Sequence, residues 1–258
     1  DLTRRDLKLK PPADLKGPAL NQWLNAKPTE VTVNNKTLTG KELTQWKYQR
    51  YMQDYLACVQ GVDDSVGKML DYLDNSDLAK NTVVIYSADN GWYLGDLGLY
   101  DKRFMYEESI RMPFLVRYPP AIKAGSVNDA MVLNVDFAPT FLEFAGLSTP
   151  AEVQGRSLKP LLAGSTPMDW RQSWYYRYYH YPNEHGTEPH YGVRTERYKL
   201  IYFHRINQWE LFDLKTDPRE LKNIYNDPQS AKIVAELKSE IARLRKELDD
   251  HDQLTDQQ

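Results

Sequence analysis

The sequence predicts an α/β fold in which layered strands and helices precede a small antiparallel sheet with a C-terminal helix. Three observations predict it: a long stretch of helical periodicity, short β-branched runs alternating with helical segments, and aromatic strand-like segments near the end. Such alternation is typical of layered α/β domains. We expect an irregular surface segment over residues 1–40, the α/β portion over 41–168, and a subdomain of antiparallel sheet plus terminal helix over 169–258.

The α/β portion begins with apolar residues spaced by three and four from Trp46 to Leu73, which predicts an amphipathic helix. The continuous run "VVIYS" (83–87) is typical of a strand that is covered on both faces in a parallel sheet. A second buried strand is expected in "MPFLVRYPP" (112–120) and a short one near 130–135. A helix should follow over 136–146, with Asp136 as its N-cap and Gly146 as its stop.

The last region predicts a hairpin folded around Thr195 to Arg197 within "HYGVRTERYKLIYFH". Asp227 and Pro228 then open the final helix, because proline is well accommodated at the first helical position. The apolar stripe of this helix is formed by Ile233, Leu237, Ile241, Leu244 and Leu248.

Composition excludes several classes of protein. The chain has 258 residues, with 33 basic and 36 acidic side chains and a net charge of -3, which argues against a nucleic-acid partner. No apolar run reaches the roughly 18 residues that cross a bilayer, so no membrane span is expected. The single Cys58 excludes an internal disulfide framework, and its place in a helix predicts a small buried side chain. The 18 tyrosines and six tryptophans suit a carbohydrate cleft and ordinary packing equally well.

The segment "SADNGWYLGDLGLYDKRFMYEES" (87–109) carries the candidate chemistry. Asp89 and Asn90 follow a predicted strand, where ligands bind in open α/β sheets, and their oxygens suit Ca²⁺ or Mg²⁺. The alternative is a turn, since Asp-Asn-Gly is a common turn sequence. Lys102, between Asp101 and Arg103, could clamp an oxyanion held against the cation. Its alternative is a solvated charge cluster.

The ordered blocks "YLACVQGVDDSVGKMLDYL", "YSADNGWYLGDLGLYDKRFMYEESIRMPFLVRYP", "VDFAPTFLEFAG" and "GRSLKPLL" resemble the C-terminal half of the type I sulfatases. These enzymes belong to the alkaline-phosphatase-like superfamily, so the resemblance implies a mixed sheet flanked by helices. It covers roughly residues 41–250. The blocks "DKRFMYEES" and "HYGVRTERYKLIYF" are most similar to sulfatases that act on sulfated amino sugars, such as the glucosamine 6-sulfatases.

The resemblance also implies roles for individual residues. Asp89 and Asn90 would ligate the cation, usually Ca²⁺ with Mg²⁺ as the alternative, and Lys102 would contact the sulfate and stabilise charge on the leaving oxygen. Asp101, Arg103 and His190 are the corresponding candidates for binding the sugar of a sulfated carbohydrate, with His185 in reserve. The chain departs from many relatives at Leu97, where they have a histidine.

A larger departure concerns the nucleophile. Sulfatases use a formylglycine made within a C/S-x-P/A-x-R motif, and this sequence contains no such motif. The paired aspartates that complete the metal site of the family are absent as well. We therefore expect these residues to be the C-terminal half of a longer enzyme, inactive without the missing N-terminal half. The family implies an extracytoplasmic location, which is periplasmic, secreted or lysosomal.

Two rival functions remain open. One is a phosphohydrolase or phosphonate hydrolase of the same superfamily, although the dizinc members place a histidine where Asn90 stands. The other is a non-catalytic glycan-binding fragment that retains the scaffold.

Overall fold

The computed structural model describes residues 2–182 and 186–251. By its internal contacts the chain divides into two units. Unit 1 comprises Asp1–Ala79 and Tyr93–Tyr100, and unit 2 comprises Lys80–Trp92 and Asp101–Gln258. These units do not follow the boundaries at residues 40 and 168, which stay predictions.

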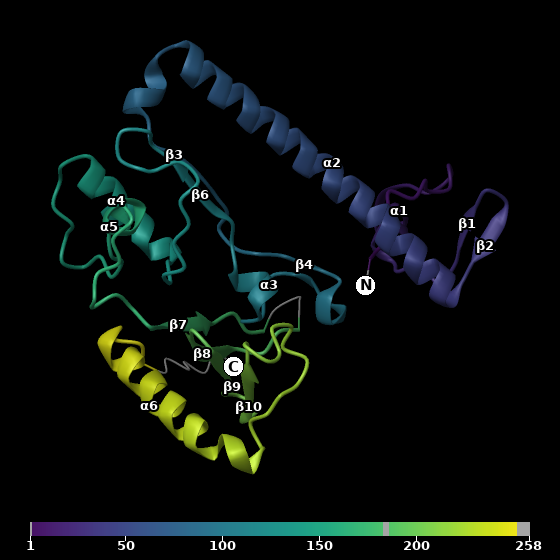
Figure 1. Cartoon of the computed structure of the whole chain (residues 1–258). Coiled ribbons are helices and arrows are strands. Elements are labelled where there is room, and N and C mark those ends of the chain that lie inside the picture. The colour runs from purple at the N-terminus through teal and green to yellow at the C-terminus, as the bar shows by residue number, and fades with distance from the viewer. Residues whose placement is uncertain (1, 183–185, 252–258) are drawn as a thin grey trace. The chain divides into compact units, whose positions relative to one another are not determined.

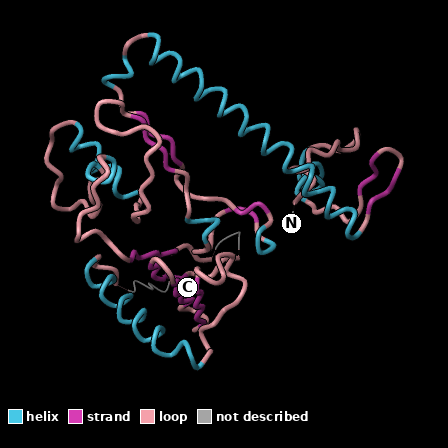
Figure 2. Tube along the Cα trace, in the orientation of Figure 1, coloured by secondary structure: helices cyan, strands magenta, loops and turns pink. Residues whose placement is uncertain are grey.

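The predicted long helix of unit 1 is confirmed as α2 (Gly40–Asn75), an unbroken helix (Figures 1 and 2). It ends where the Ser76 N–H binds the carbonyl of Tyr72 at 3.0 Å. Among its residues only Leu43 is buried against the described chain. Apolar side chains in its middle, such as Leu56 and Met69, are 56% and 58% exposed, and Cys58 is also exposed rather than buried as predicted.

Residues 1–40 are less irregular than expected. They contain α1 (Gly17–Asn25) and an antiparallel hairpin of β1 (Val31–Val33) and β2 (Lys36–Leu38). Asn34 and Asn35 connect these strands with φ values of 49° and 62°, which a two-residue hairpin turn requires. Elements this short show no sustained periodicity, which explains the expectation. Farther along the chain, the short strand β4 (Tyr93–Leu94) pairs with β5 (Tyr100–Asp101), and the turn η2 (Asp96–Gly98) lies between them.

The helical turn η1 (Leu78–Asn81) precedes β3 (Val84–Ser87) of unit 2, which pairs with β6 (Phe114–Arg117). Both strands were predicted, but the parallel pairing was wrong for this pair, because Val84 lies opposite Arg117 and Ser87 opposite Phe114 in antiparallel register. A β-branched run indicates that a strand is covered on both faces and does not encode the direction of its neighbour. In the described chain Tyr86 and Leu115 are 42% and 61% exposed, so this pair is not fully covered.

The strand expected near residues 130–135 does not form. The short helical turn η3 (Asn134–Asp136) leads directly into α4 (Phe137–Phe144) because the buried Asp136 carboxylate accepts the Leu133 and Arg156 N–H groups at 2.8 Å each. Asp136 is the N-cap residue of α4, but its side chain caps the preceding turn instead. Gly146, with φ of 72°, stops the helix as predicted. Beyond it lies α5 (Lys159–Leu162).

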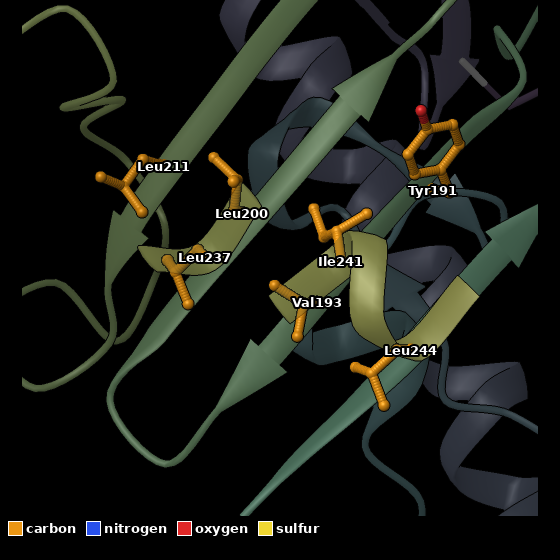
Figure 3. Close-up of a cluster of buried hydrophobic side chains, with 7 residues drawn as sticks. All are labelled: Tyr191, Val193, Leu200, Leu211, Leu237, Ile241 and Leu244. Atoms are coloured by element: carbon orange, nitrogen blue, oxygen red, sulfur yellow. The ribbon is translucent and has the colours of Figure 1, made fainter. Parts of the chain in front are cut away.

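The antiparallel sheet has the order β10-β9-β8-β7, from strands β7 (Ser173–Tyr178), β8 (His190–Thr195), β9 (Tyr198–Phe203) and β10 (Gln208–Asp213). The β8–β9 hairpin confirms the predicted turn around Thr195 to Arg197. The turn η4 (Pro228–Ser230) begins where Asp227 accepts the Gln229 N–H at 2.9 Å, and it continues into α6 (Ala231–Glu247). Leu237, Ile241 and Leu244 of α6 pack on Val193 and Leu200 of the sheet (Figure 3). Burial of each such side chain contributes about 1.5–3 kcal/mol.

A second apolar cluster lies under the segment that carries Lys102. Met105 is fully buried and packs with Ile201 and Phe203 of β9 and with Phe212 of β10. The segment between β5 and α3 (Glu107–Ile110) is therefore fixed to the antiparallel sheet by a side chain that cannot leave without exposing this cluster.

Candidate active site

Asp89 and Asn90 lie just beyond the carboxyl end of β3, as predicted. Asp89 is exposed and Asn90 is half-buried. The Asn90 side-chain amide donates from Nδ2 to the carbonyl of Gly91 at 2.7 Å, which leaves the Oδ1 atom as the available acceptor. Two neighbouring residues of one turn thus carry hard oxygen donors.

Gly91 fixes this turn against α3. Its N–H donates to the Ser109 carbonyl at 2.7 Å. A Cβ at this position would lie 2.0 Å from the carbonyl oxygen of Glu108 and 3.0 Å from the carbonyl carbon of Ser109. Both are backbone atoms, so only glycine allows this approach, and that requirement explains the third residue of the Asp-Asn-Gly sequence.

Lys102 is bound to the same short helix. Its carbonyl accepts a hydrogen bond of 2.9 Å from the Ser109 hydroxyl, and Ser109 is 3% exposed. The Lys102 Nζ lies over the Trp92 ring, 5.2 Å from the ring centroid. Ser109 therefore contacts both Gly91 and Lys102, and Trp92, two residues after Asn90, lies beneath the ammonium. The two sequence-predicted groups belong to one connected structure.

Asp101 and Arg103, which flank the lysine, form an ion pair of 3.4 Å with each other. Asp101 adopts a φ of 82°, a conformation that turns the chain sharply at this point. Arg103 also acts on Tyr176 of β7. Burial raises the pKa of Tyr176 to about 12, and the guanidinium of Arg103 opposes that shift. Their proposed contact with the sugar stays a prediction.

His190, at the start of β8, is fully buried rather than at the surface. Its ring stacks with Phe104, Tyr176 and Tyr178, and its Nδ1 lies 2.8 Å from the Glu188 carbonyl. Burial lowers the pKa of His190 to about 4, so the imidazole is neutral at pH 7. The Nε2 atom has no hydrogen-bond partner within the described residues. His190 thus lies next to the Lys102 segment through Phe104, and its substrate contact stays a prediction, while His185 lies outside the described residues.

An ion cluster that the sequence analysis missed supports α3. Lys199 of β9 is fully buried, with its Nζ 2.9 Å from Glu107 Oε1 and 2.6 Å from Glu220 Oε1. Arg194 reaches Glu107 Oε2 at 3.3 Å. Burial raises the pKa of Glu107, but Lys199 and Arg194 outweigh burial and hold that pKa below its usual range. Burial raises the pKa of Glu220, which Lys199 opposes. The sequence signal was a lysine inside the run "YKLIYF".

The donor set at Asp89 and Asn90 fits a hard divalent cation in kind but is incomplete in number. Carboxylate and amide oxygens suit Ca²⁺ or Mg²⁺, and Ca²⁺ takes six to eight oxygens. Over residues 2–182 and 186–251, no group of three or more His, Cys, Asp or Glu side chains comes close enough to hold a metal. Further ligands would have to come from elsewhere in the protein.

Comparison with known proteins matches this chain to two family models and to a curated relative. The family model described as Sulfatase matches residues 18–147, and the one described as N-sulphoglucosamine sulphohydrolase, C-terminal, matches residues 95–247. The N-acetylglucosamine-6-O-sulfatase of Bacteroides thetaiotaomicron is 48% identical over 90% of this chain and 42% of its own length.

Solved structures also match this chain. One protein, solved with its substrate D-glucosamine-2-N,6-O-disulfate, matches with a TM-score of 0.81 and 50% identity over 83% of this chain and 44% of its own. A phosphonate monoester hydrolase from Silicibacter pomeroyi matches with a TM-score of 0.72 and 28% identity over 80% and 42%. The chain spans less than half the length of the curated relatives that it matches. These likenesses confirm the predicted α/β fold with its small antiparallel sheet and C-terminal helix.

Proposed function

Since this chain belongs to the sulfatase family, we propose that the complete protein hydrolyses sulfate esters on a carbohydrate, with a sulfated amino sugar of the glucosamine type as its substrate. The observation that carries the proposal is the connection of Lys102 and the Asp89–Asn90 turn through Ser109. The 48% identity to an N-acetylglucosamine-6-O-sulfatase supports the sugar class.

In this proposal the residues of the chain bind and orient the sulfate group. Asp89 and Asn90 would hold a divalent cation, Ca²⁺ or alternatively Mg²⁺, which would draw negative charge from the sulfate oxygens when bound. The ammonium of Lys102 would contact the sulfate and stabilise the charge that develops on the leaving oxygen. Asp101, Arg103 and His190 are proposed to bind the sugar. The nucleophile, expected to be a formylglycine, would come from the N-terminal part of the protein.

The need for that N-terminal part is supported by the surface of α2. Its apolar side chains Leu56, Val59 and Met69 are 47–58% exposed in the described chain, which is unusual for a helix with a regular apolar stripe. Further polypeptide packed on this face would bury them. We expect the chain alone to release no sulfate.

An extracytoplasmic location is part of the same proposal. In residues 2–182 and 186–251, every helix is too short or too polar to cross a bilayer.

The test is a sulfate-release assay on the complete polypeptide with glucosamine 6-sulfate and a uronate 2-sulfate as substrates, beside an assay of alcohol release from a phosphonate monoester. Lys102→Ala should lower turnover of the amino-sugar ester by about 100- to 1000-fold, because it removes one preorganised charge contact. Lys123→Ala is the matched control, since Lys123 is an exposed lysine of unit 2 and should leave turnover unchanged.

Three outcomes would contradict the proposal. Near-normal turnover in Lys102→Ala would remove Lys102 from the site. Preference for the phosphonate ester together with two bound zinc ions would favour the phosphonate hydrolase. Tight glycan binding without any hydrolysis would favour the non-catalytic alternative.

A further inference from the structure

Lys199 is the only buried lysine in the described part of the chain, and it lies on β9, away from the predicted ligands. Its ammonium forms ion pairs with Glu107 at 2.9 Å and Glu220 at 2.6 Å. An ammonium without solvent is costly unless it is paired, so these two carboxylates determine where Lys199 can be. Glu220 in turn depends on Lys199 for its charge compensation, whereas Glu107 also pairs with Arg194.

Glu220 binds the backbone of α3 as well as the lysine. Its Oε2 accepts the Glu107 N–H at 2.7 Å, while its Oε1 faces Lys199. The first residue of α3 is thus held twice, by its backbone to Glu220 and by its side chain to Lys199. Arg194 adds a third contact to the Glu107 side chain at 3.3 Å. With Lys199 and Arg194 opposite Glu107 and Glu220, the four charges balance.

α3 is a single turn of four residues, so whatever fixes Glu107 also fixes Ser109. Ser109 receives the Gly91 N–H at its carbonyl and donates its hydroxyl to the Lys102 carbonyl. A continuous path of short contacts therefore runs from Lys199 through Glu107 and Ser109 to both halves of the candidate site. A helix of one turn has little stability of its own, which makes it dependent on these outside contacts.

We propose that Lys199 is a positioning residue, which holds α3 so that Ser109 keeps the Lys102 segment and the Asp89–Asn90 turn in register. The proposal rests on the function proposed above for Lys102 and the turn. Lys199 touches no substrate in this view. Its effect on turnover arises because displacement of a catalytic group by about 1 Å can cost 100-fold in rate.

The alternative is that the ion cluster contributes only to general stability. A comparison of Lys199→Met with Arg171→Met distinguishes a positioning role from a contribution to general stability. Arg171 forms a comparable pair with the buried Asp136, at 2.5 and 2.7 Å, elsewhere in unit 2. Each substitution leaves one buried carboxylate, Glu220 or Asp136, without its cation, but only Lys199 lies on the path to Ser109.

Amide hydrogen exchange on the complete polypeptide is the first measurement. Lys199→Met should speed exchange at the hydrogen-bonded amides of Gly91, Ser109 and Ile110 by about tenfold or more, because local opening reports lost local contacts. Arg171→Met should instead act on Leu133 and Arg156, whose N–H groups bind Asp136, and should leave Gly91 and Ser109 within about twofold of wild type. If both variants speed all of these amides equally, or if Lys199→Met leaves Gly91 and Ser109 unchanged, the proposal is wrong.

Glu107→Gln serves if Lys199→Met does not fold. It keeps the shape of the side chain and removes its charge, so the same amides should exchange several-fold faster, and unchanged exchange would count against the proposal. In the activity assay Lys199→Met should lower kcat by about tenfold or more, while Arg171→Met leaves kcat of the folded fraction unchanged. If the wild-type polypeptide releases no sulfate, the proposed function fails, and the exchange experiment still decides whether Lys199 positions α3.

Discussion

Gly91→Ala should disrupt the candidate site at a single backbone contact. The new Cβ would lie 2.0 Å from the Glu108 carbonyl oxygen, and a tolerable contact needs at least 3.0 Å. The turn and α3 must therefore separate by about 1 Å. That movement lengthens the hydrogen bond from Gly91 N to Ser109 O from 2.7 Å to about 3.7 Å, beyond hydrogen-bonding distance.

The cost follows from that loss. One hydrogen bond is broken and a buried carbonyl is left unsatisfied, which together should lower the free energy of unfolding by about 2–4 kcal/mol. Since Gly91 is adjacent to Asn90 and Ser109 holds Lys102, the same displacement should lower turnover by about 100-fold.

Urea unfolding and sulfate release, both on the complete polypeptide, measure the two effects. Lys123→Ala is the control, because Lys123 is an exposed residue of unit 2 and its loss should change the free energy of unfolding by less than about 0.5 kcal/mol and leave turnover unchanged. A Gly91→Ala variant with the wild-type urea midpoint and turnover would refute the inference that this contact holds the site.

Two further predictions concern polar groups that are buried or half-buried near the site. Because the pKa of His190 is about 4 in the folded protein and about 6.5 in an unfolded chain, the unfolded state binds the proton first as pH falls. The free energy of unfolding should therefore decrease by up to about 3 kcal/mol between pH 6.5 and 4, and His190→Phe should remove that part of the slope in urea titrations; an equally steep slope would contradict it. Tyr106→Phe should cost about 1–3 kcal/mol, because the half-buried Tyr106 hydroxyl donates to Glu210 at 2.8 Å. Tyr179→Phe, with its exposed hydroxyl 3.4 Å from Asp250, should change stability by less than about 0.5 kcal/mol in the same melts, and equal losses would argue against burial as the cause.

Local patterns in the sequence predicted most elements of the fold. The long helix α2, the hairpin at Thr195 to Arg197 and the terminal helix after Asp227 each depend on periodicity or turn chemistry within a few residues. The direction of β6 relative to β3 depends on pairing between residues some thirty positions apart, and no local signal records it. The strand expected near residue 133 does not form because the Asp136 carboxylate stabilises a helical turn there. Arg171, the partner of Asp136, is also distant in sequence.

The candidate ligands could be predicted because Asp89, Asn90 and Lys102 belong to one continuous segment with a recognisable pattern. Ser109 and Lys199 could not. Ser109 acts through its hydroxyl and its carbonyl on backbone groups, which leaves no pattern of residue types. Lys199 stands out only as a charge inside an apolar strand, and its partner Glu107 lies 92 positions away by sequence number.

The contacts of Ser109 also bear on any attempt to redesign this protein for another sugar. The Ser109 hydroxyl and the Ser109 carbonyl form hydrogen bonds with two parts of the segment that begins at Asp89, at Lys102 and at Gly91. A graft that replaced only the residues around Lys102 would keep a Ser109 whose hydrogen bonds fit the original backbone. Residues 89–109 would have to be exchanged as one segment, together with Lys199 of β9, which holds α3 in place in our proposal.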